Sequence, residues 1–264
     1  MLRLNGFSLA LALGLASAMV SSERALAFGS GPWIVTIGGW VVAQPDYMGS
    51  DDYEAAFRPI FNIRKEGSKD WLSLPDDSAG IALFETSDFR IGPAFGFTPE
   101  RNSSDNRALR GLKDVDFTFE AGAFVEYWPA EALRTRLEVL HGLNGHDGLI
   151  ANLSADFVLR PAERWMVTIG PRLTWVDDNY ADAYFSVGPG SPTLPVFRAE
   201  GGLHSVGVGA SLSYDVTEAV QFRVFGEYDR LMGDAADSPL VDLRGSEDQF
   251  TAGLGVSYRF TVGR

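Results

Sequence analysis

Histidine and serine are the residue types in this chain that could form a hydrolytic pair, and they are adjacent once, at His204-Ser205. A serine nucleophile needs a base within hydrogen-bond reach. Neighbouring residues on a β-strand point to opposite faces of the sheet. The alternation around this pair predicts a strand in which His204 faces outward and Ser205 inward, so the two could not share a proton. The other histidines, His141 and His146, fall at a strand end and in a short loop, where we expect polar rim residues rather than bases.

The composition excludes several other kinds of chemistry. The chain of 264 residues has no cysteine, so disulfides, iron–sulfur clusters, zinc–thiolate sites and cysteine nucleophiles are impossible. The 3 histidines lack the spacing of metal ligands. With 35 Asp+Glu against 22 Lys+Arg the net charge is −13, which disfavours a nucleic-acid partner. We therefore expect no catalytic, cofactor-binding or metal-binding residue, no cofactor and no enzyme activity.

Three groups of aspartates are a weaker chemical signal, because carboxylates are the ligands that hard divalent cations prefer. The groups are Asp46, Asp51 and Asp52; Asp177, Asp178 and Asp182; and Asp234, Asp237, Asp242 and Asp248. All of them lie in polar stretches that we expect to be loops. A solvated acidic rim is the favoured interpretation and a cation site the alternative.

The elements that would position these residues are strands. In Val115–Tyr127 every odd-numbered residue is apolar or aromatic, while most even-numbered ones are polar or glycine. The same alternation recurs in Leu149–Leu159, Trp165–Trp175, Val206–Val216 and Phe250–Phe260. Strands of ten or more residues exceed the usual length of about 5–6 in soluble sheets. They suit a tilted membrane strand, which needs about 9–11 residues. The pattern predicts an all-β, closed antiparallel transmembrane barrel, with a secreted β-sandwich as the alternative.

Connections of two kinds interleave along the chain. Short ones are expected near Glu66–Ser68, Glu85–Ser87, Pro129–Glu131, Pro161–Glu163 and Thr217–Glu218. Long polar ones are expected at Gln44–Tyr53, Thr98–Lys113, Asp177–Arg198 and Met232–Asp248, with two shorter ones at Pro75–Ala79 and Asn144–Asp147. They delimit about twelve strands, give or take two, starting near residues 33, 55, 70, 80, 88, 114, 132, 148, 164, 200, 219 and 249. An even number places both chain ends and the short turns in the periplasm, and the longer loops outside.

The predicted lumen is charged. Strand parity places these side chains inside: Glu120, Glu126, Arg134, Arg136, Glu138, Asp156, Arg172, Arg223, Glu227 and Arg259. Glu126 is expected within cross-strand reach of Arg134 or Arg136 across a tight turn. In a narrow barrel, mixed charges are expected to pair with one another rather than to line a wide channel. A small, cation-leaning pore is the alternative.

The N-terminus has the pattern of a secretory signal peptide. Arg3 precedes the apolar stretch Leu9–Val20, and Ala25-Leu26-Ala27 is a small-residue cleavage signature, with Ala16-Ser17-Ala18 as a second candidate. We expect residues 1–27 to be removed and residues 28–264 to form one barrel domain. Export and the barrel together predict the outer membrane of a Gram-negative cell. The lipid and lipopolysaccharide of that membrane would surround the barrel, and divalent cations at the acidic rim could bridge to lipopolysaccharide phosphates.

Several segments carry a family resemblance. The most specific is Gly233-Asp234-Ala235-Ala236-Asp237-Ser238-Pro239, within Tyr228–Phe260. Further landmarks are Pro45-Asp46-Tyr47-Met48-Gly49-Ser50-Asp51, Gly92-Pro93 and Glu120-Ala121-Gly122. Across essentially the whole mature chain the sequence resembles the MipA/OmpV family of MltA-interacting outer-membrane proteins. The resemblance implies a scaffold that links a murein lytic transglycosylase to a murein synthase. Other members are described loosely as outer-membrane antigens or adhesins. The family motif carries no set of binding residues.

The C-terminus predicts one further partner, the machinery that inserts barrels into the outer membrane. Such barrels usually finish on an aromatic residue, here Phe260, and Tyr258 precedes it on the same face. The chain departs from that pattern by adding Thr261–Arg264. The expected function is a non-enzymatic outer-membrane scaffold; the alternative is a small outer-membrane pore, and a lipid hydrolase is disfavoured.

Overall fold

The computed structural model describes residues 32–66 and 74–263. Its strands are β1 (Trp33–Pro45), β2 (Tyr53–Lys65), β3 (Ala79–Gly80), β4 (Phe84–Glu85), β5 (Phe89–Thr98), β6 (Thr118–Ala130), β7 (Leu133–Leu143), β8 (Leu149–Ala162), β9 (Trp165–Val176), β10 (Gly202–Asp215), β11 (Val220–Leu231) and β12 (Asp248–Val262). The expected signal peptide, residues 1–27, and the strand expected to start near residue 70 lie outside the described residues.

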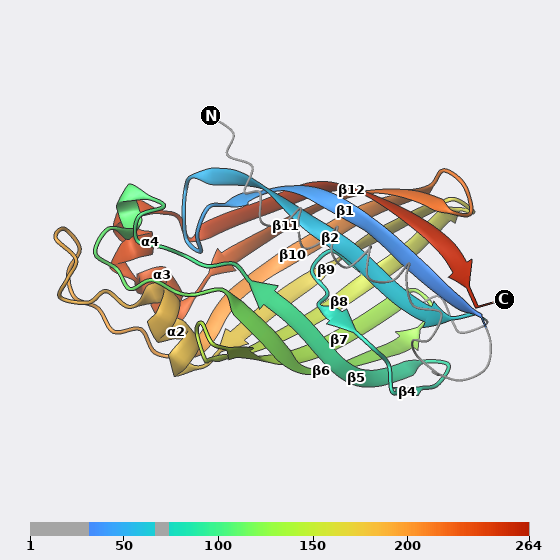
Figure 1. The fold of residues 1–264 in the computed structure, drawn as a ribbon, viewed down its shortest axis with the longest axis horizontal. Helices are drawn as coiled ribbons and strands as arrows, with labels where there is room; N and C mark the ends of the chain where they lie inside the picture. The colour runs from blue at the N-terminus through green and yellow to red at the C-terminus, as the bar shows by residue number, and fades with distance from the viewer. Residues whose placement is uncertain (1–31, 67–73, 264) are drawn as a thin grey trace.

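The strands form one antiparallel sheet that curls into a barrel (Figure 1). The neighbours follow the order β2-β1-β12-β11-β10-β9-β8-β7-β6-β5-β3, and β4 also pairs with β5. The first and last long strands meet, since β1 pairs with β12 from Trp33↔Val262 to Ala43↔Ala252. At the two edges of the sheet, β2 pairs with β1, and β3 and β4 pair with β5. Because β2 pairs with neither β3 nor β4 in the described residues, the barrel is nearly closed. The predicted twelve-stranded antiparallel barrel is confirmed, although β3 and β4 have only 2 residues each.

The alternation of side chains follows the predicted parity in β6. The outward Phe119 and Tyr127 are 44% and 48% exposed, whereas the luminal Glu120 and Glu126 are 6% and 0% exposed. Outward apolar side chains recur around the wall, as a barrel surrounded by lipid requires.

The prediction was wrong at the start of this strand. Val115 was expected to face outward, but it is 2% exposed and forms an isolated antiparallel bridge with Arg101. β6 begins only at Thr118. Val115 belongs to a loop that packs inward on other loops, so the strand parity does not apply to it.

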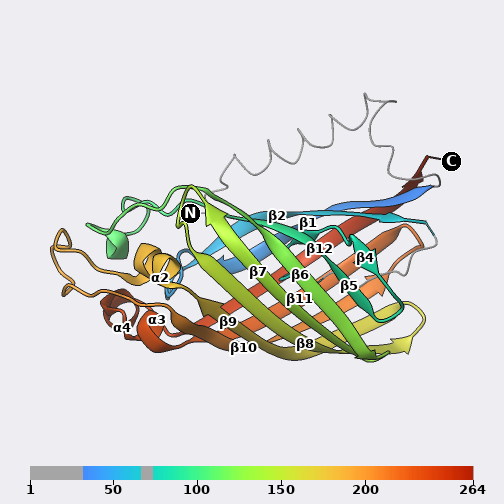
Figure 2. The same cartoon turned by 90° about the horizontal axis from the view of Figure 1, so that it is seen from below.

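The two ends of the barrel differ. Short turns join β6 to β7, β8 to β9 and β10 to β11 at the end where β12 finishes, while longer connections and the helices gather at the opposite end (Figures 1 and 2). The helical segments are η1 (Arg107–Leu109), α2 (Asp178–Phe185), α3 (Gly233–Asp237) and α4 (Pro239–Arg244). None of the helices in the described residues is long and apolar enough to span a membrane. β12 continues past Phe260, since Thr261 and Val262 still pair with β1.

Candidate functional site: the lumen and its two closures

The barrel interior contains a network of buried ion pairs centred on Arg134. Its guanidinium is fully buried; Nη2 lies 2.7 Å from Asp77 Oδ2 and 2.8 Å from Glu126 Oε2, and Nη1 lies 3.3 Å from Asp156 Oδ2. Arg90 adds a second cation at 2.8 Å from Glu126 Oε2. The predicted proximity of Glu126 and Arg134 is therefore confirmed. Mixed charges pair here with one another across the lumen.

The carboxylate of Asp77 comes from a segment that sequence reasoning placed elsewhere. Pro75–Ala79 was predicted to be an outer loop, but Leu74–Ser78 lies inside the barrel; we call these five residues the luminal plug. Arg134 Nη2 donates to both carboxylate oxygens of Asp77, at 2.8 and 2.7 Å. Arg172 Nε donates to Asp76 at 2.6 Å. The prediction failed because two aspartates after a proline also fit a solvated loop, and only the arginines of distant strands reveal their role.

Two further contacts fix the plug at its ends. The Ser78 hydroxyl donates to Glu138 Oε1 at 2.7 Å. Leu74 is buried in an apolar cluster with Trp128 and Val158. The plug thus joins an apolar contact and charged contacts in one short segment inside the barrel, which we call the floor of the lumen.

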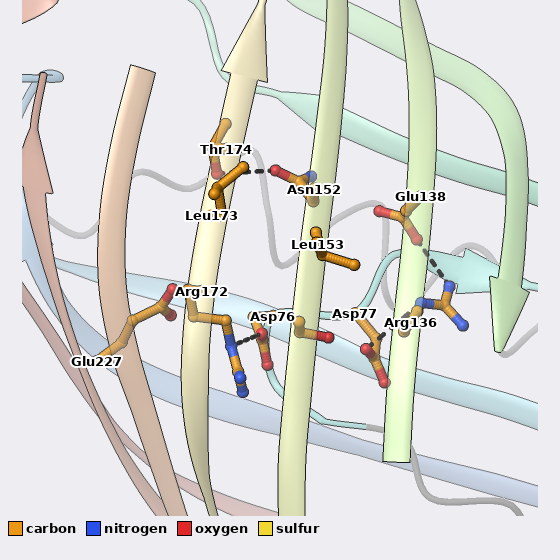
Figure 3. Close-up of a pocket in the computed structure, with 11 residues that line it drawn as sticks. Asp76, Asp77, Arg136, Glu138, Asn152, Leu153, Arg172, Leu173, Thr174 and Glu227 are labelled. Atoms are coloured by element: carbon orange, nitrogen blue, oxygen red, sulfur yellow. Dashed lines mark hydrogen bonds and ion pairs between the residues drawn. The ribbon is translucent and has the colours of Figure 1, made fainter. Parts of the chain in front are cut away.

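A cavity of about 130 Å³ remains above this floor. Figure 3 shows its walls, which come from the plug and from strands β7, β8, β9 and β11. The side chains around it include Arg136, Glu138, Asn152, Arg172 and Glu227. The predicted luminal positions of these charged residues are confirmed. A cavity of this size holds several water molecules.

The part of the lumen wall formed by β1, β11 and β12 contains a tightly packed apolar cluster. The ring of Trp40 meets that of Phe225 edge-on, with centroids 5.1 Å apart. Glycine makes room for both: a Cβ on Gly255 would lie 2.4 Å from the Trp40 ring, and one on Gly253 would lie 2.5 Å from the Phe225 ring. Side chains rather than open space therefore fill this side of the barrel.

The outer loops form the second closure, which we call the cap: residues 46–52, 99–117, 177–201 and 232–247. Its main apolar cluster includes Tyr180, Tyr184 and Phe185 of α2 together with Val176 and Leu231 at the barrel rim. The side chain of Asp177 accepts a hydrogen bond from Tyr180 N at 3.0 Å and so caps the helix N-terminus. α2 therefore packs directly against the ends of the wall strands.

Arg101 binds the other end of α2. This side chain is buried, and it donates to the carbonyl oxygens of Tyr184 at 2.7 Å and of Ala183 and Lys113 at 3.0 Å. Cations stabilise a helix C-terminus because its last carbonyls have no partner within the helix. The Arg101 guanidinium also lies 5.5 Å from the centroid of the Tyr184 ring. Sequence reasoning missed Arg101, which reads there as one basic residue in a long polar loop.

The first and last long loops are joined within the cap. Gly49 has φ = +87°, and a Cβ there would lie 2.4 Å from Val241 Cγ2. Its N–H donates to Gln249 Oε1 at 3.0 Å, and its carbonyl accepts from Ser246 N at 2.9 Å. Tyr47 donates its hydroxyl hydrogen bond to Arg244 O at 3.3 Å, and burial raises the Tyr47 pKa to about 12. Two stretches that carry the family resemblance, residues 45–51 and Tyr228–Phe260, therefore contact each other here.

Ser238 connects the helices of the cap. Its hydroxyl donates to Phe185 O at 2.7 Å and accepts from Leu240 N at 3.3 Å, and the residue is fully buried. It thereby satisfies the last carbonyl of α2 and the N-terminus of α4 at once.

The histidines do not form a catalytic pair. His146 is buried, with Nε2 3.2 Å from Glu120 Oε1, while Nδ1 accepts from Gly148 N at 3.0 Å. Since Nδ1 accepts a bond, the proton of the neutral ring lies on Nε2 and points to Glu120. Gly142 leaves the space for this ring, since a Cβ there would lie 2.2 Å from it. The expectation that His146 is a rim residue was wrong; His141 does lie exposed on the outer face.

His204 was also misplaced. It was predicted to face outward, but it is 8% exposed, and Ser205 is 6% exposed. The pairing of β10 with β9 shifts register between Leu203 and Ser205, which is a β-bulge. A bulge changes the side-chain phase, so Leu203 takes the outward position and His204 turns inward onto α2.

The aspartate groups are used mostly to bind backbone and neighbouring side chains. Asp46 Oδ2 and Asp52 Oδ2 accept from Asn106 Nδ2 at 2.7 and 3.4 Å. Asp178 and Asp234 accept from backbone N–H groups of residues 201 and 200. Within residues 32–66 and 74–263, no group of three histidine or acidic side chains is placed to hold a metal ion.

Comparisons with solved structures give distant similarities. The chain is 14% identical to the COG4313 outer membrane channel from Pseudomonas putida F1, with 91% of this chain and 99% of that chain covered and a TM-score of 0.45. For the NanC porin the identity is 9%, the coverage 86% and 98%, and the TM-score 0.40. For the N-terminal β-barrel domain of Pseudomonas aeruginosa OprF the values are 16%, 66% and 97%, and 0.31. At these TM-scores none of the three informs function.

The comparison with protein families is decisive. No curated protein matches the chain. The family model described as "MltA-interacting protein MipA" matches residues 37–260, from within β1 to Phe260 on β12. A barrel with lipid-exposed apolar side chains and a family match over nearly its whole length identify an outer-membrane barrel protein. The chain belongs to the MipA family.

Proposed function

We propose that this protein is a non-conducting outer-membrane scaffold that binds a murein-cleaving lytic transglycosylase at its periplasmic end. The observation that carries the proposal is the filled lumen. The plug closes it on one side through Arg134 and Arg172, and the cap closes it on the other through α2. The cavity beside the plug measures about 130 Å³, and we expect no continuous path for solutes through the lumen.

The family description supports a binding role, because it names an interaction and not a reaction. The first expected partner is the lytic transglycosylase MltA, and the second, by family resemblance, is a murein synthase. The same proposal includes three further steps or partners. Residues 1–27 are removed on export, the insertion machinery recognises Tyr258 and Phe260, and lipopolysaccharide surrounds the rim.

The arrangement of the histidines supports a non-enzymatic role. In the described part of the chain the imidazole of His146 hydrogen-bonds Glu120 and Gly148, and no serine hydroxyl is bonded to any histidine ring. A serine hydrolase needs such a bond to activate its nucleophile. Purified protein is therefore expected to lack serine-esterase activity. As a scaffold, it is also expected to lack murein-hydrolase activity.

The surface available to a periplasmic partner is a set of short turns. Glu131, Glu163, Arg164 and Glu218 are exposed at the tips of these turns. Each turn alone is much smaller than a standard interface of about 800 Å² per partner. A stable partner must therefore contact several of the turns together, across the end of the barrel.

The test combines binding and conductance. The barrel in nanodiscs is immobilised, and its affinity for purified MltA-type transglycosylase is measured. Reversing the charges of Glu163 and Arg164 is expected to weaken binding at least tenfold. The matched control reverses Arg198 and Glu200, an exposed pair in the outer cap, and should leave the affinity unchanged.

Planar-bilayer recording is run on the same preparation. No stepwise conductance is expected. Stepwise conductance without transglycosylase binding would overturn the scaffold proposal in favour of a pore. Binding that depends on the outer pair rather than on the periplasmic pair would place the interface on the wrong side of the membrane.

A further inference from the structure

His204 is a buried ionisable group that neither the luminal network nor the proposed scaffold role uses. The bulge in β10 turns its ring toward the cap, where it meets the Phe185 ring edge-on at 5.3 Å between centroids. The Tyr180 ring lies 5.8 Å away. Both rings belong to α2, so His204 lies where this helix covers the mouth of the lumen.

The imidazole lacks a counter-charge. Its Nδ1 is buried and has no hydrogen-bond partner within the described residues. The backbone of His204 accepts from Met232 N at 2.8 Å, which is the contact from the α3 side. A protonated ring would therefore carry a buried N–H without an acceptor, which is costly.

The ionisable groups around the ring cannot supply that charge. On α2, burial raises the pKa of Tyr184 to about 12 and that of Tyr180 well above its ordinary value, so both phenols are neutral near pH 7. Glu120 is bonded to His146. The two carboxylates on α2 itself are exposed, and Asp178 accepts a hydrogen bond from Gly201 N. Arg101 lies against Tyr184 and adds a positive charge to the same cluster.

These contacts make protonation of the ring and closure of the cap compete. A closed cap buries the imidazole beneath α2, whereas an open cap exposes it to water, where a free histidine has a pKa of about 6.5. The contribution of the neutral His204 ring to the stability of the closed cap is then fully present above that pH, and it is lost as the pH falls below it. One such group raises the ratio of open to closed cap by about tenfold when the pH falls from 7.5 to 5.5.

We propose that His204 is an acid sensor that releases α2 from the mouth of the lumen when its ring is protonated. The sensor is a property of the outer cap, and it operates whether or not a periplasmic enzyme binds at the other end. The plug below remains in place, because its ion pairs do not include a histidine.

The test is hydrogen–deuterium exchange of the barrel in nanodiscs at pH 7.5 and pH 5.5, corrected for the intrinsic exchange rates. Protection of Asp178–Phe185 is expected to fall about tenfold at the lower pH. The β8–β9 turn at Ala162–Trp165 is the internal reference and should not change. In His204→Phe, which keeps an aromatic ring against Phe185, the loss of protection should disappear.

The chain supplies matched controls in its other histidines. His141→Gln, on the outer face, should respond to acid as the unmodified protein does. His204→Gln is a second uncharged variant in case the larger Phe disturbs the cap, and barrel folding of each variant is checked by heat-modifiable gel mobility. Equal protection at both pH values in the unmodified protein would overturn the proposal. So would an acid response that persists in the His204 variants and vanishes in His146→Gln.

Discussion

The floor and the cap close the same lumen with different chemistry. The floor is a short plug without helix, held by guanidinium–carboxylate pairs such as Arg134–Asp77 at 2.7 Å and Arg172–Asp76 at 2.6 Å. The cap is held by apolar clusters around α2, with charge used mainly at helix ends, as in Arg101. The floor should therefore fail when one charge is left without its partner. The cap should fail gradually, as packing and helix capping are lost.

Removing Arg134 is expected to have the largest effect. Arg134→Ala leaves the buried carboxylates of Asp77, Glu126 and Asp156 without their shared cation. Loss of one partner of a buried ion pair typically costs about 3–5 kcal/mol. Urea unfolding in vesicles should show that loss, while exchange protection of α2 stays unchanged. Arg160→Ala, at an exposed site, is the control, and equal losses in both variants would contradict a charge-held floor.

Removing Arg101 should have the next largest effect, and at the opposite end. Arg101→Ala deprives three carbonyl groups of their donor. Hydrogen bonds to a charged group contribute about 1.5–3 kcal/mol, and the loss of several of them should release α2. Hydrogen exchange of Asp178–Phe185 should accelerate at least tenfold, with the luminal strands unaffected. Arg101→Lys should restore part of the protection, since a lysine supplies the charge without the fork of donors.

A glycine tests whether backbone shape or packing holds the cap. Gly49 has a positive φ of 87° and touches Val241. Gly49→Ala should cost about 1–3 kcal/mol through backbone strain and overpacking. The cap should loosen at Gly49 and at α4 together, as measured by exchange. Combining it with Val241→Ala should recover part of the loss; no recovery would mean that backbone strain alone is responsible.

The mildest change is at the edge of the floor. Asp76→Asn removes the charge opposite Arg172 but keeps an oxygen acceptor, and Asp156 still lies 2.8 Å from Arg172 Nη2. We expect a loss of about 1 kcal/mol, in line with a single net hydrogen bond. A much larger effect would show that Asp76, and not Asp77, anchors the plug. Paired unfolding curves of Asp76→Asn and Asp77→Asn give this ranking.

The same contrast explains what sequence could predict. The wall obeys a period of two, so the parity of β6 and β7 placed Glu126 beside Arg134 and Arg136 inside the lumen. Such a pattern predicts the residues of one strand from their neighbours along the chain. The position of the plug could not be predicted in this way. It depends on Asp76 and Asp77 binding arginines of β9 and β7, and no local sequence pattern shows these contacts.

The cap was the least predictable part. Its positions depend on packing between loops far apart in sequence, such as Gly49 against Val241. His204 departs from parity because one extra residue in β10 shifts the phase, and a bulge has no clear signature in the alternation. The family resemblance did identify the relevant segments, although it did not show that they touch.

The position of the plug along the chain also sets an order for folding. Asp76 binds Arg172, 96 residues later, yet the wall closes only when β1 pairs with β12 at the far end of the sequence. The plug leads directly into β3, which has no pairing with β2 in the described residues, so we expect it to bind its arginines before the β1–β12 seam joins the wall. Contacts of such long sequence separation are slow to form, because loop closure costs entropy before the contact repays it. A plug with weakened charges should therefore delay barrel closure, and the delay would appear in refolding rates even where the final stability changes little.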